Sequence, residues 1–180
     1  GMRRVFSIIG RPYDEQVSIA TRLPEPSSSF KRALVGMKKG QLVYATRVAG
    51  DFVLPKETAD PILFIAGGIG ITPLISFLMA PGRRDITILY AVSSVADIMF
   101  ADVLRQYDIK VVIVTPDTAP LPDPAWLRQH GVITRELLTR YIQPDTHVYI
   151  SGPPPMVTRA KRYAASLGAR HIRTDHFTGY

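Results

Sequence analysis

The clearest candidate for chemistry is a glycine-rich run, GGIGITP, at residues 67–73. Glycines let a backbone approach a pyrophosphate closely, and a following helix offers unpaired amides and the positive end of its dipole. A tight turn that simply needs glycine is the structural alternative, but the run follows an expected strand and opens an expected helix, which favours nucleotide binding. The predicted cofactor-binding residues here are Gly67, Gly68, Gly70, Thr72 and Pro73.

A second turn, SGPPPM at residues 151–156, also follows an apolar stretch. Gly152 permits a ligand ring to lie against the backbone, and Pro153 fixes the approach into the next helix. Taken alone, a purely structural turn explains this pattern equally well, but two such turns at one sheet edge favour a shared ligand site. The predicted cofactor contacts therefore include Gly152, Pro153 and Met156.

Two hydroxyls, those of Ser93 and Ser94, come directly after a third apolar stretch. They either contact the ribose or the 2′-phosphate of a nucleotide, or cap the helix that follows. The residues alone leave both roles open.

The pattern of residues 59–180 would position these turns. Short apolar runs, typical of buried parallel strands, lie at residues 62–66, 86–91, 111–115 and 147–151. Helical patterns begin at Thr72 and span residues 97–107, 134–142 and 156–167, with Gly168 placed to end the last one. Repeated strand–helix–strand units predict an α/β fold with a doubly wound parallel sheet, whose ligands bind beyond the carboxyl ends of the strands. The stretch at 116–124 is typical of a surface loop.

Residues 1–58 follow a different pattern and are predicted to form a separate, smaller domain. Stretches typical of β-strands lie at residues 4–9, 17–22 and 42–46, with a short helical pattern at 30–35. The charged and polar stretch at 55–61 is typical of a connector. The predicted domains are therefore residues 1–58 and 59–180.

Composition narrows the class of protein. The chain has 180 residues, 46% hydrophobic residues and no cysteine, which excludes disulfides and thiolate metal sites within it and fits a cytoplasmic setting. The four histidines lack metal-ligand spacing, so we predict no metal site. The net charge is +7, but no aromatic-and-basic motif accompanies it, so an acidic partner or phosphate-bearing ligand is favoured over nucleic acid.

Two stretches could be mistaken for targeting segments. The run at 61–82 is free of charge, but its glycines and proline favour a strand, a loop and a helix over a membrane span. The Gly-Met start is typical of a tag remnant before an initiator methionine, with no secretory leader pattern after it.

In their order and spacing, the motifs resemble those of the ferredoxin–NADP⁺ reductase superfamily. RVFS at residues 4–7 resembles its flavin-binding Arg-x-Tyr/Phe-Ser/Thr motif, and SFKRAL at 29–34, KG at 39–40 and GDF at 50–52 resemble the rest of that barrel. The glycine run matches the family's nucleotide loop, and YISGP at 149–153 matches the strand that meets the nicotinamide. FTGY at 177–180 resembles the family's terminal aromatic segment. The resemblance implies an NAD(P)-binding domain preceded by a partial antiparallel β-barrel of the FAD domain.

The resemblance also assigns roles to single residues. Phe6 would pack on the isoalloxazine and Ser7 would hydrogen-bond near its N5 atom, while Arg4 and Ser29 would lie near the flavin pyrophosphate. Ser151 stands where many relatives have a cysteine, and Tyr180 would cover the flavin face that the nicotinamide must reach. For Ser93 and Ser94, the resemblance favours contact with the ligand over a capping role. The implied catalytic residues are Ser7, Ser151 and Tyr180.

The implied reaction is hydride transfer between NAD(P)H and FAD, with electrons passed to a ferredoxin-like (iron–sulfur) or flavodoxin-like partner. Basic residues at 31–32 and 38–39 could guide an acidic carrier. The family's barrel has further strands before its Arg-x-Phe-Ser motif, so an incomplete barrel is expected, which a homodimer or a complementing chain could complete. The alternative is a nucleotide-binding subunit or sensor of a split reductase. NAD and NADP both stay open, because Ser94 stands where NADP-preferring relatives often have arginine and Arg105 lies farther along.

Overall fold

The computed structural model of the chain describes residues 4–11, 13–23, 25–45, 48–55, 59–82 and 85–176. Within them, one sheet of six strands has the order β6-β5-β4-β3-β7-β8, and every neighbouring pair is parallel. The strands are β3 (Ile62–Gly67), β4 (Ile86–Ala91), β5 (Lys110–Thr115), β6 (Leu127–His130), β7 (His147–Gly152) and β8 (His171–His176). This confirms the predicted α/β fold with a doubly wound sheet.

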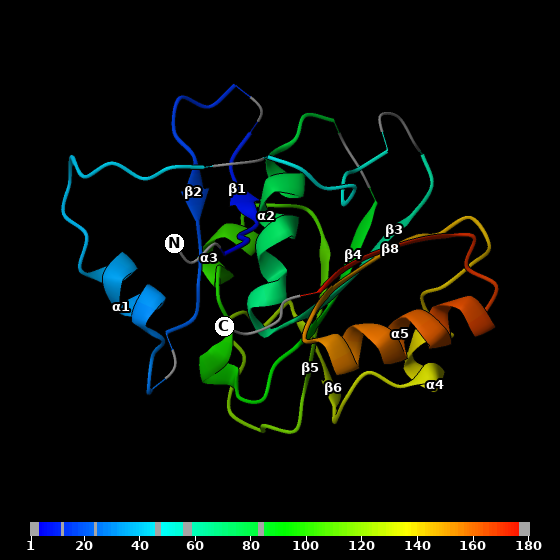
Figure 1. Cartoon of the computed structure of the whole chain (residues 1–180). Coiled ribbons are helices and arrows are strands. Elements are labelled where there is room, and N and C mark those ends of the chain that lie inside the picture. The colour runs from blue at the N-terminus through cyan, green and yellow to red at the C-terminus, as the bar shows by residue number, and fades with distance from the viewer. Residues whose placement is uncertain are drawn as a thin grey trace.

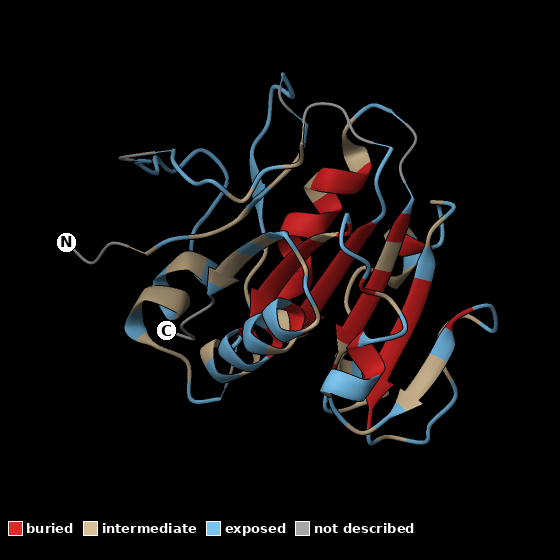
Figure 2. Ribbon diagram, turned by 90° about the vertical axis from the view of Figure 1, so that its right-hand side faces the viewer, coloured by how far each residue is buried: buried red, intermediate tan, exposed pale blue. Residues whose placement is uncertain are grey.

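Helices cover both faces of the sheet (Figure 1). One face packs on α2 (Thr72–Met79) and α3 (Ala101–Leu104), and the other packs on α4 (Arg135–Leu138) and α5 (Pro154–Ser166). Because successive side chains of a strand point to opposite faces, Phe64 and Tyr149 join the first core while Leu63 and Val148 join the second. Figure 2 shows the result as buried central strands beneath α2.

The charge-free stretch forms β3, a 3₁₀ turn η1 (Gly68–Ile71) and α2, as predicted. The alternation of apolar runs and glycines therefore gave the correct order of elements. Of the helices in the described part of the chain, none combines the length and the apolar character that a membrane crossing requires.

Several predicted elements were wrong in extent. Residues 42–45 form no strand, and their apolar side chains are exposed. The helix expected over 97–107 is split into a 3₁₀ turn η2 (Val95–Asp97) and α3, because Phe100 adopts a left-handed conformation at φ +60°. Thr134 caps α4 as a side-chain acceptor for the Leu137 amide, but α4 is shorter than the predicted helix. The polar edge strands β6 and β8 were not predicted.

The N-terminal part has little regular structure. It consists of β1 (Ile8–Ile9) and β2 (Ser18–Ile19), which pair antiparallel, and α1 (Ser29–Val35). Strand β1 docks on α2 in two ways. The Ser76 hydroxyl donates to the Ile8 carbonyl at 2.6 Å and accepts from the Gly10 amide at 3.2 Å, and the Ile9 side chain packs against the core that α2 covers. The small antiparallel sheet thus stands where the partial barrel was expected.

An aromatic cluster fixes the end of this part to the large sheet. The ring of Phe52 lies 5.3 Å from that of Tyr149, 5.7 Å from that of Phe77 and 5.9 Å from that of Phe64. The Tyr149 hydroxyl also donates to the Val53 carbonyl at 2.8 Å. Stacked and edge-to-face rings at such spacings add stability beyond their burial, so this cluster is the main anchor of residues 51–55.

Replacing Phe52 with alanine is expected to lower the free energy of unfolding by about 2 kcal/mol, because three ring contacts are lost and a cavity opens over β3 and β7. Urea unfolding measures the change, and hydrogen exchange should show faster exchange in residues 4–55. Val53→Ala is the matched control, because that side chain is 52% exposed and its carbonyl remains. Equal unfolding midpoints for the two variants would contradict the anchor.

Candidate functional site

The two glycine turns lie side by side at the carboxyl edge of the sheet. Strand β3 ends at Gly67 and β7 ends at Gly152, and these strands are neighbours with Ala66 opposite Ser151. The chain moves to opposite sides of the sheet from these two strands, since β4 lies beside β3 and β8 lies beside β7. Ligands of open α/β sheets bind at such a switch point.

Gly70 allows the closest approach between the turns. A Cβ atom placed on Gly70 would lie 2.7 Å from the Gly152 Cα atom and 2.5 Å from the Ser151 carbonyl carbon. These are backbone atoms, which cannot turn aside as a flexible side chain can. Gly67 is also enclosed, since its Cβ would meet Met156 Sδ at 2.6 Å and Pro153 Cδ at 2.9 Å. Much of the glycine pattern therefore serves the packing of the two turns.

Gly68 differs from the other glycines of the run. It has a φ of +51°, is partly exposed, and a Cβ atom there would meet nothing within 4 Å. The space in front of this backbone is open at the edge of the sheet. The neighbouring N-cap residue of α2 is Ile71, whose side chain makes no capping hydrogen bond. Gly68 also begins the 3₁₀ turn η1, whose N-cap Gly67 supplies no side-chain hydrogen bond, so its open backbone suits an anionic group such as a pyrophosphate.

Thr72 and Pro73 shape the start of α2. Thr72 is buried, and its hydroxyl donates to the Ile69 carbonyl at 2.7 Å, which holds the 3₁₀ turn against the helix. Pro73 occupies the first turn of the helix, where a missing amide hydrogen costs nothing. Both residues lie at the site, and both have a structural task there.

Ser151 is fully buried, and its Oγ atom has no hydrogen-bond partner within the described part of the chain. A buried hydroxyl without a partner costs about 1–3 kcal/mol, so this atom points to a group that the site receives. Ser151 pairs in register with Asp175 of β8, which places both side chains on one face of the sheet.

Asp175 was missed in the sequence and connects Ser151 with the N-terminal part. The Ser7 hydroxyl donates to Asp175 Oδ2 at 3.4 Å. Burial raises the pKa of Asp175 above its usual range, and the hydrogen bond from Ser7 partly offsets that shift. The alternating pattern of β8, HIRTDH, was the available signal, because it places an acid at the carboxyl end of an edge strand.

The segment at 4–7 reaches α1 as well. Phe6 stacks on Phe30 with ring centroids 6.0 Å apart, and the Arg4 guanidinium lies 5.6 Å from the centre of the Phe30 ring. Ser29 is the first residue of α1 and is exposed, whereas the cap is Ser28, whose hydroxyl accepts from the Lys31 amide at 3.3 Å. Arg4 and Phe6 thus both contact the Phe30 ring, which follows Ser29 in the chain, and Ser7 is directed to the sheet. Tyr180 lies outside the described residues.

Ser94 is a helix cap. Its hydroxyl accepts from the Ala96 amide at 3.2 Å and donates to Asp117 Oδ2 at 2.8 Å, whereas Ser93 is exposed. Asp117, from the loop after β5, was also missed in the sequence. It accepts from the Ala119 amide at 2.9 Å and the Val95 amide at 2.7 Å, and these bonds together with Ser94 lower its pKa to about 2.

A parallel sheet with a glycine turn at its switch point, joined to a small antiparallel part, defines a dinucleotide-binding α/β protein. Residues 64–162 match the model of the oxidoreductase NAD-binding domain, and the chain belongs to this family. Its expected place in the ferredoxin–NADP⁺ reductase superfamily is confirmed by this match together with its structural neighbours.

Two curated relatives are similar along most of the chain. The chain is 30% identical to flavohemoprotein A of Dictyostelium discoideum, an alignment that covers 92% of this chain and 44% of the relative. It is 29% identical to NADH-cytochrome b5 reductase 1 of Ajellomyces capsulatus, covering 79% of this chain and 51% of the relative. The chain thus spans about half the length of these relatives.

Two solved structures share the fold. The cytochrome P450 reductase GcoB of Amycolatopsis superimposes with a TM-score of 0.77 at 22% identity, covering 98% of this chain and 57% of the other. The ferredoxin-NADP⁺ reductase of Plasmodium falciparum gives a TM-score of 0.71 at 18% identity, covering 96% and 76%. Because both cover nearly the whole chain, the likeness of fold includes the N-terminal part.

Replacing Gly70 with alanine is expected to lower the free energy of unfolding by about 3 kcal/mol, because the new methyl group overlaps the backbone at Ser151 and Gly152. Gly36→Ala is the control, since Gly36 has an ordinary φ of −73° and its Cβ would lie 3.4 Å from the Arg32 carbonyl oxygen. That variant should stay within about 0.5 kcal/mol of the parent in denaturant unfolding. A Gly70→Ala protein as stable as the parent would refute the close packing of the two turns.

Proposed function

We propose that this chain is the dinucleotide-binding module of an NAD(P)H-dependent flavin oxidoreductase of the ferredoxin reductase type. Residues 59–180 would bind the nicotinamide dinucleotide, and residues 1–58 would supply groups to an FAD site. The observation that carries the proposal is the buried, unpartnered hydroxyl of Ser151 between the open turn at Gly68 and the Ser7–Asp175 pair. The names of the relatives, a flavohemoprotein and an NADH-cytochrome b5 reductase, support the same class of reaction.

The groups at the sheet edge fit a dinucleotide. Its pyrophosphate would lie against the open backbone of Gly68 at the start of η1, and its nicotinamide end would lie towards Gly152 and Ser151, where the buried hydroxyl requires a polar partner. When bound, the nicotinamide and the flavin supply the hydride transfer, while the chain aligns them and excludes water.

The N-terminal segment would position the flavin. Phe6 offers a flat face with few rotatable bonds, and the cation of Arg4 lies beside it near the start of α1. Ser7 donates its hydrogen to Asp175, so its oxygen is left to accept a hydrogen bond from the ring system. Asp175 is a positioning residue in this scheme, because it acts through Ser7.

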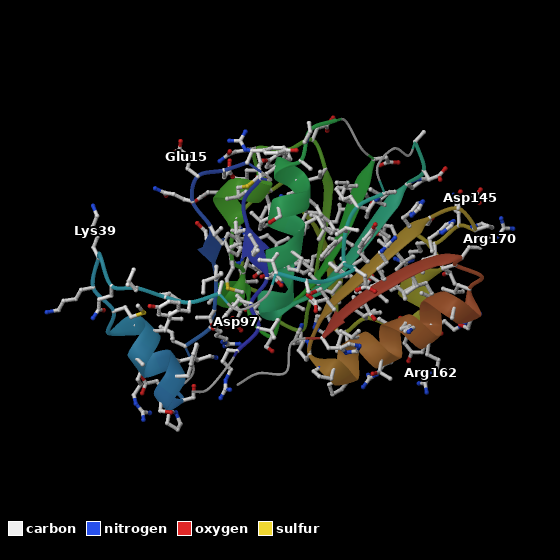
Figure 3. All side chains as sticks on the ribbon, turned by 45° about the horizontal axis from the view of Figure 1, so that its top comes forward. Glu15, Lys39, Asp97, Asp145, Arg162 and Arg170 are labelled. Carbon is white, nitrogen blue, oxygen red and sulfur yellow. The ribbon has the colours of Figure 1, made fainter. Side chains whose placement is uncertain are left out.

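Electrons would leave to an acidic ferredoxin-like or flavodoxin-like carrier. The basic residues Lys31, Arg32, Lys38 and Lys39 lie on α1 and in the loop after it, and Lys39 points away from the body of the molecule in Figure 3. A cluster of one charge sign speeds the encounter with a partner of the other sign.

A subunit of a split reductase is the second candidate. The observation that favours it is a set of exposed apolar side chains in the N-terminal part, with Leu42 81%, Tyr44 84% and Val48 80% exposed. Clustered exposed apolar residues are typical of surfaces that another chain covers.

The deciding experiment is an absorbance spectrum of the protein after incubation with FAD and desalting, followed by anaerobic addition of NADH or NADPH. A working reductase retains flavin that the nucleotide bleaches. Phe6→Ala should lose the flavin, whereas the control Tyr13→Ala, an aromatic residue that is fully exposed, should keep it. Nucleotide binding without flavin retention would instead favour the split reductase, and loss of both would refute the proposal.

Replacing Asp175 with asparagine should slow flavin bleaching by about tenfold, since the neutral amide orients Ser7 less firmly. The raised pKa of Asp175 predicts the pH dependence: as the pH falls through that pKa, the carboxylate takes a proton and becomes a weaker acceptor for the Ser7 hydroxyl, so the rate falls. In a stopped-flow pH profile, the bleaching rate of the Asp175→Asn variant should not show this fall on the acidic side, which we call the acidic limb.

Stability separates this role from a structural one. A raised carboxyl pKa means that ionisation is unfavourable in the folded state, so removing the charge should leave stability at neutral pH unchanged or higher. A variant that is equally slow but strongly destabilised, or one that keeps the acidic limb, would contradict the positioning role.

A further inference from the structure

We propose that one face of this chain binds a membrane surface rich in anionic phosphate headgroups. The face consists of exposed basic residues on and just after α4, on α5 and in the turn before β8, and we call it the basic face. Its members are Arg135, Arg140, Arg159, Lys161, Arg162 and Arg170. The inference goes beyond the proposed flavin chemistry and does not rest on it.

The charges of the chain are distributed unevenly along the sequence. Residues 146–174 contain Arg159, Lys161, Arg162, Arg170 and Arg173 but no aspartate or glutamate. With the histidines neutral, this stretch carries a charge of +5, whereas the whole chain carries +7, so the rest of the chain carries only +2. A concentration of one charge sign creates a field that attracts surfaces of the opposite sign.

Helix α5 presents its charges on the side opposite to the core. Its buried residues pack against the sheet, whereas Arg159, Lys161 and Arg162 are exposed. Figure 3 shows Arg162 on the outer side of the helix. Because α5 contains no acid, no charge within the helix neutralises these three residues.

The neighbouring helix α4 extends this face. The two helices pack against each other, and the Arg135 Nε atom donates to the Ser166 hydroxyl of α5 at 3.2 Å. Arg140 follows shortly after the end of α4 and is exposed. Glu136 offsets one of these two charges, so the surface stays positive across both helices.

Most of the basic face is available to a ligand. Among the residues that the structure describes, Arg159, Lys161 and Arg162 take part in no ion pair. Arg170 is paired with Asp145 at 3.5 Å, but these side chains are 69% and 70% exposed, and so exposed an ion pair is weak. A headgroup phosphate can therefore compete with Asp145 for Arg170.

The basic face lies on the side of the sheet away from the candidate site. Side chains two positions apart in a strand share one face, so Ser151 lies on the same face as Tyr149, in the core that α2 covers. Helices α4 and α5 cover the opposite face, away from the N-terminal part (Figure 1). A membrane bound there would leave the glycine turns and the N-terminal part accessible from the aqueous side.

The composition of the face favours a lipid surface over a protein partner. Protein interfaces are centred on buried aromatic or apolar anchors. Residues 133–176, all of which the structure describes, expose no large apolar side chain. A plane of phosphate groups needs no such anchor, because it attracts basic residues through charge alone. All members of the basic face except Lys161 are arginines, whose planar guanidinium suits phosphate oxygens.

The test is cosedimentation of the purified chain with lipid vesicles. One set consists of phosphatidylcholine alone, and the other contains about one third phosphatidylglycerol, which is anionic. We expect at least about tenfold tighter binding to the anionic vesicles. Raising the sodium chloride concentration from about 50 mM to about 300 mM should abolish most of this binding, because salt screens the attraction.

The variant with Arg159→Gln, Lys161→Gln and Arg162→Gln together should bind anionic vesicles at least about tenfold more weakly than the wild type. The three side chains are exposed, and glutamine is a good helix former, so the variant should fold. The wild-type comparison of the two lipid compositions needs no variant, and it decides the matter even where the triple variant fails to fold.

The matched control carries Arg32→Gln, Lys38→Gln and Lys39→Gln, which remove the same net charge from exposed positions in the N-terminal part. Its affinity for anionic vesicles should stay within about twofold of the wild type, since these charges lie away from the bound surface. Equal losses in the two triple variants would overturn the inference, because the net charge of the chain would then be responsible.

Equal binding to both kinds of vesicle, or binding to neither, would also overturn the inference. Titration with a short DNA duplex and with polyglutamate tests the other polyanions. If either one binds more tightly than the anionic vesicles, and the variant of α5 loses that binding, the basic face serves a nucleic acid or an acidic protein instead of a membrane.

Discussion

The contact between two backbones at Gly70 and Ser151 determines the shape of the nucleotide edge. At Gly70, no side-chain atom separates the turn after β3 from the turn after β7, because a Cβ atom there would lie 2.7 Å from the Gly152 Cα atom. This contact keeps the ends of β3 and β7 together where the chain leaves the sheet in opposite directions. The open backbone of Gly68 and the buried hydroxyl of Ser151 thereby lie at the same edge of the sheet, although 83 positions separate them in the numbering of the sequence.

The same edge explains how an N-terminal part with little regular structure is held. Its two-stranded sheet and single helix could not form a core of their own, and α1 buries no residue. Instead, this part uses the core of the large sheet through Phe52 and the rings around it, and it uses the carboxyl edge through Ser7. Residues 4–7 are held separately, by Ser7 at Asp175 and by Phe6 at Phe30, and any flavin contact by Phe6 depends on those contacts.

The sequence predicted what local patterns encode. The four central strands are mainly apolar because both of their faces are covered, and the two turns are recognisable from their glycines and prolines. The edge strands β6 and β8 are polar, since one side of each meets solvent, and so they lacked that signal. A stretch such as 42–45 has β-propensity but no partner strand among the described residues, and propensity without pairing makes no strand. The missed acids share one cause, which is that their partners are distant in the sequence: Asp175 lies 168 positions from Ser7 and Asp117 lies 23 positions from Ser94, and only the fold brings them together.

Two aspartates at the carboxyl edge show why residue type alone could not assign the site. Asp117 accepts hydrogen bonds from backbone amides and a serine, which stabilise its charged form, so its pKa falls to about 2. Asp175 lies against the sheet with burial as the dominant influence, so its pKa rises. The first acid is thereby ionised at neutral pH, and the second is a group whose charge responds to pH. The type of residue is the same in both cases, so the neighbouring hydrogen-bond donors and the burial decide whether an aspartate carries a fixed charge or one that responds to pH.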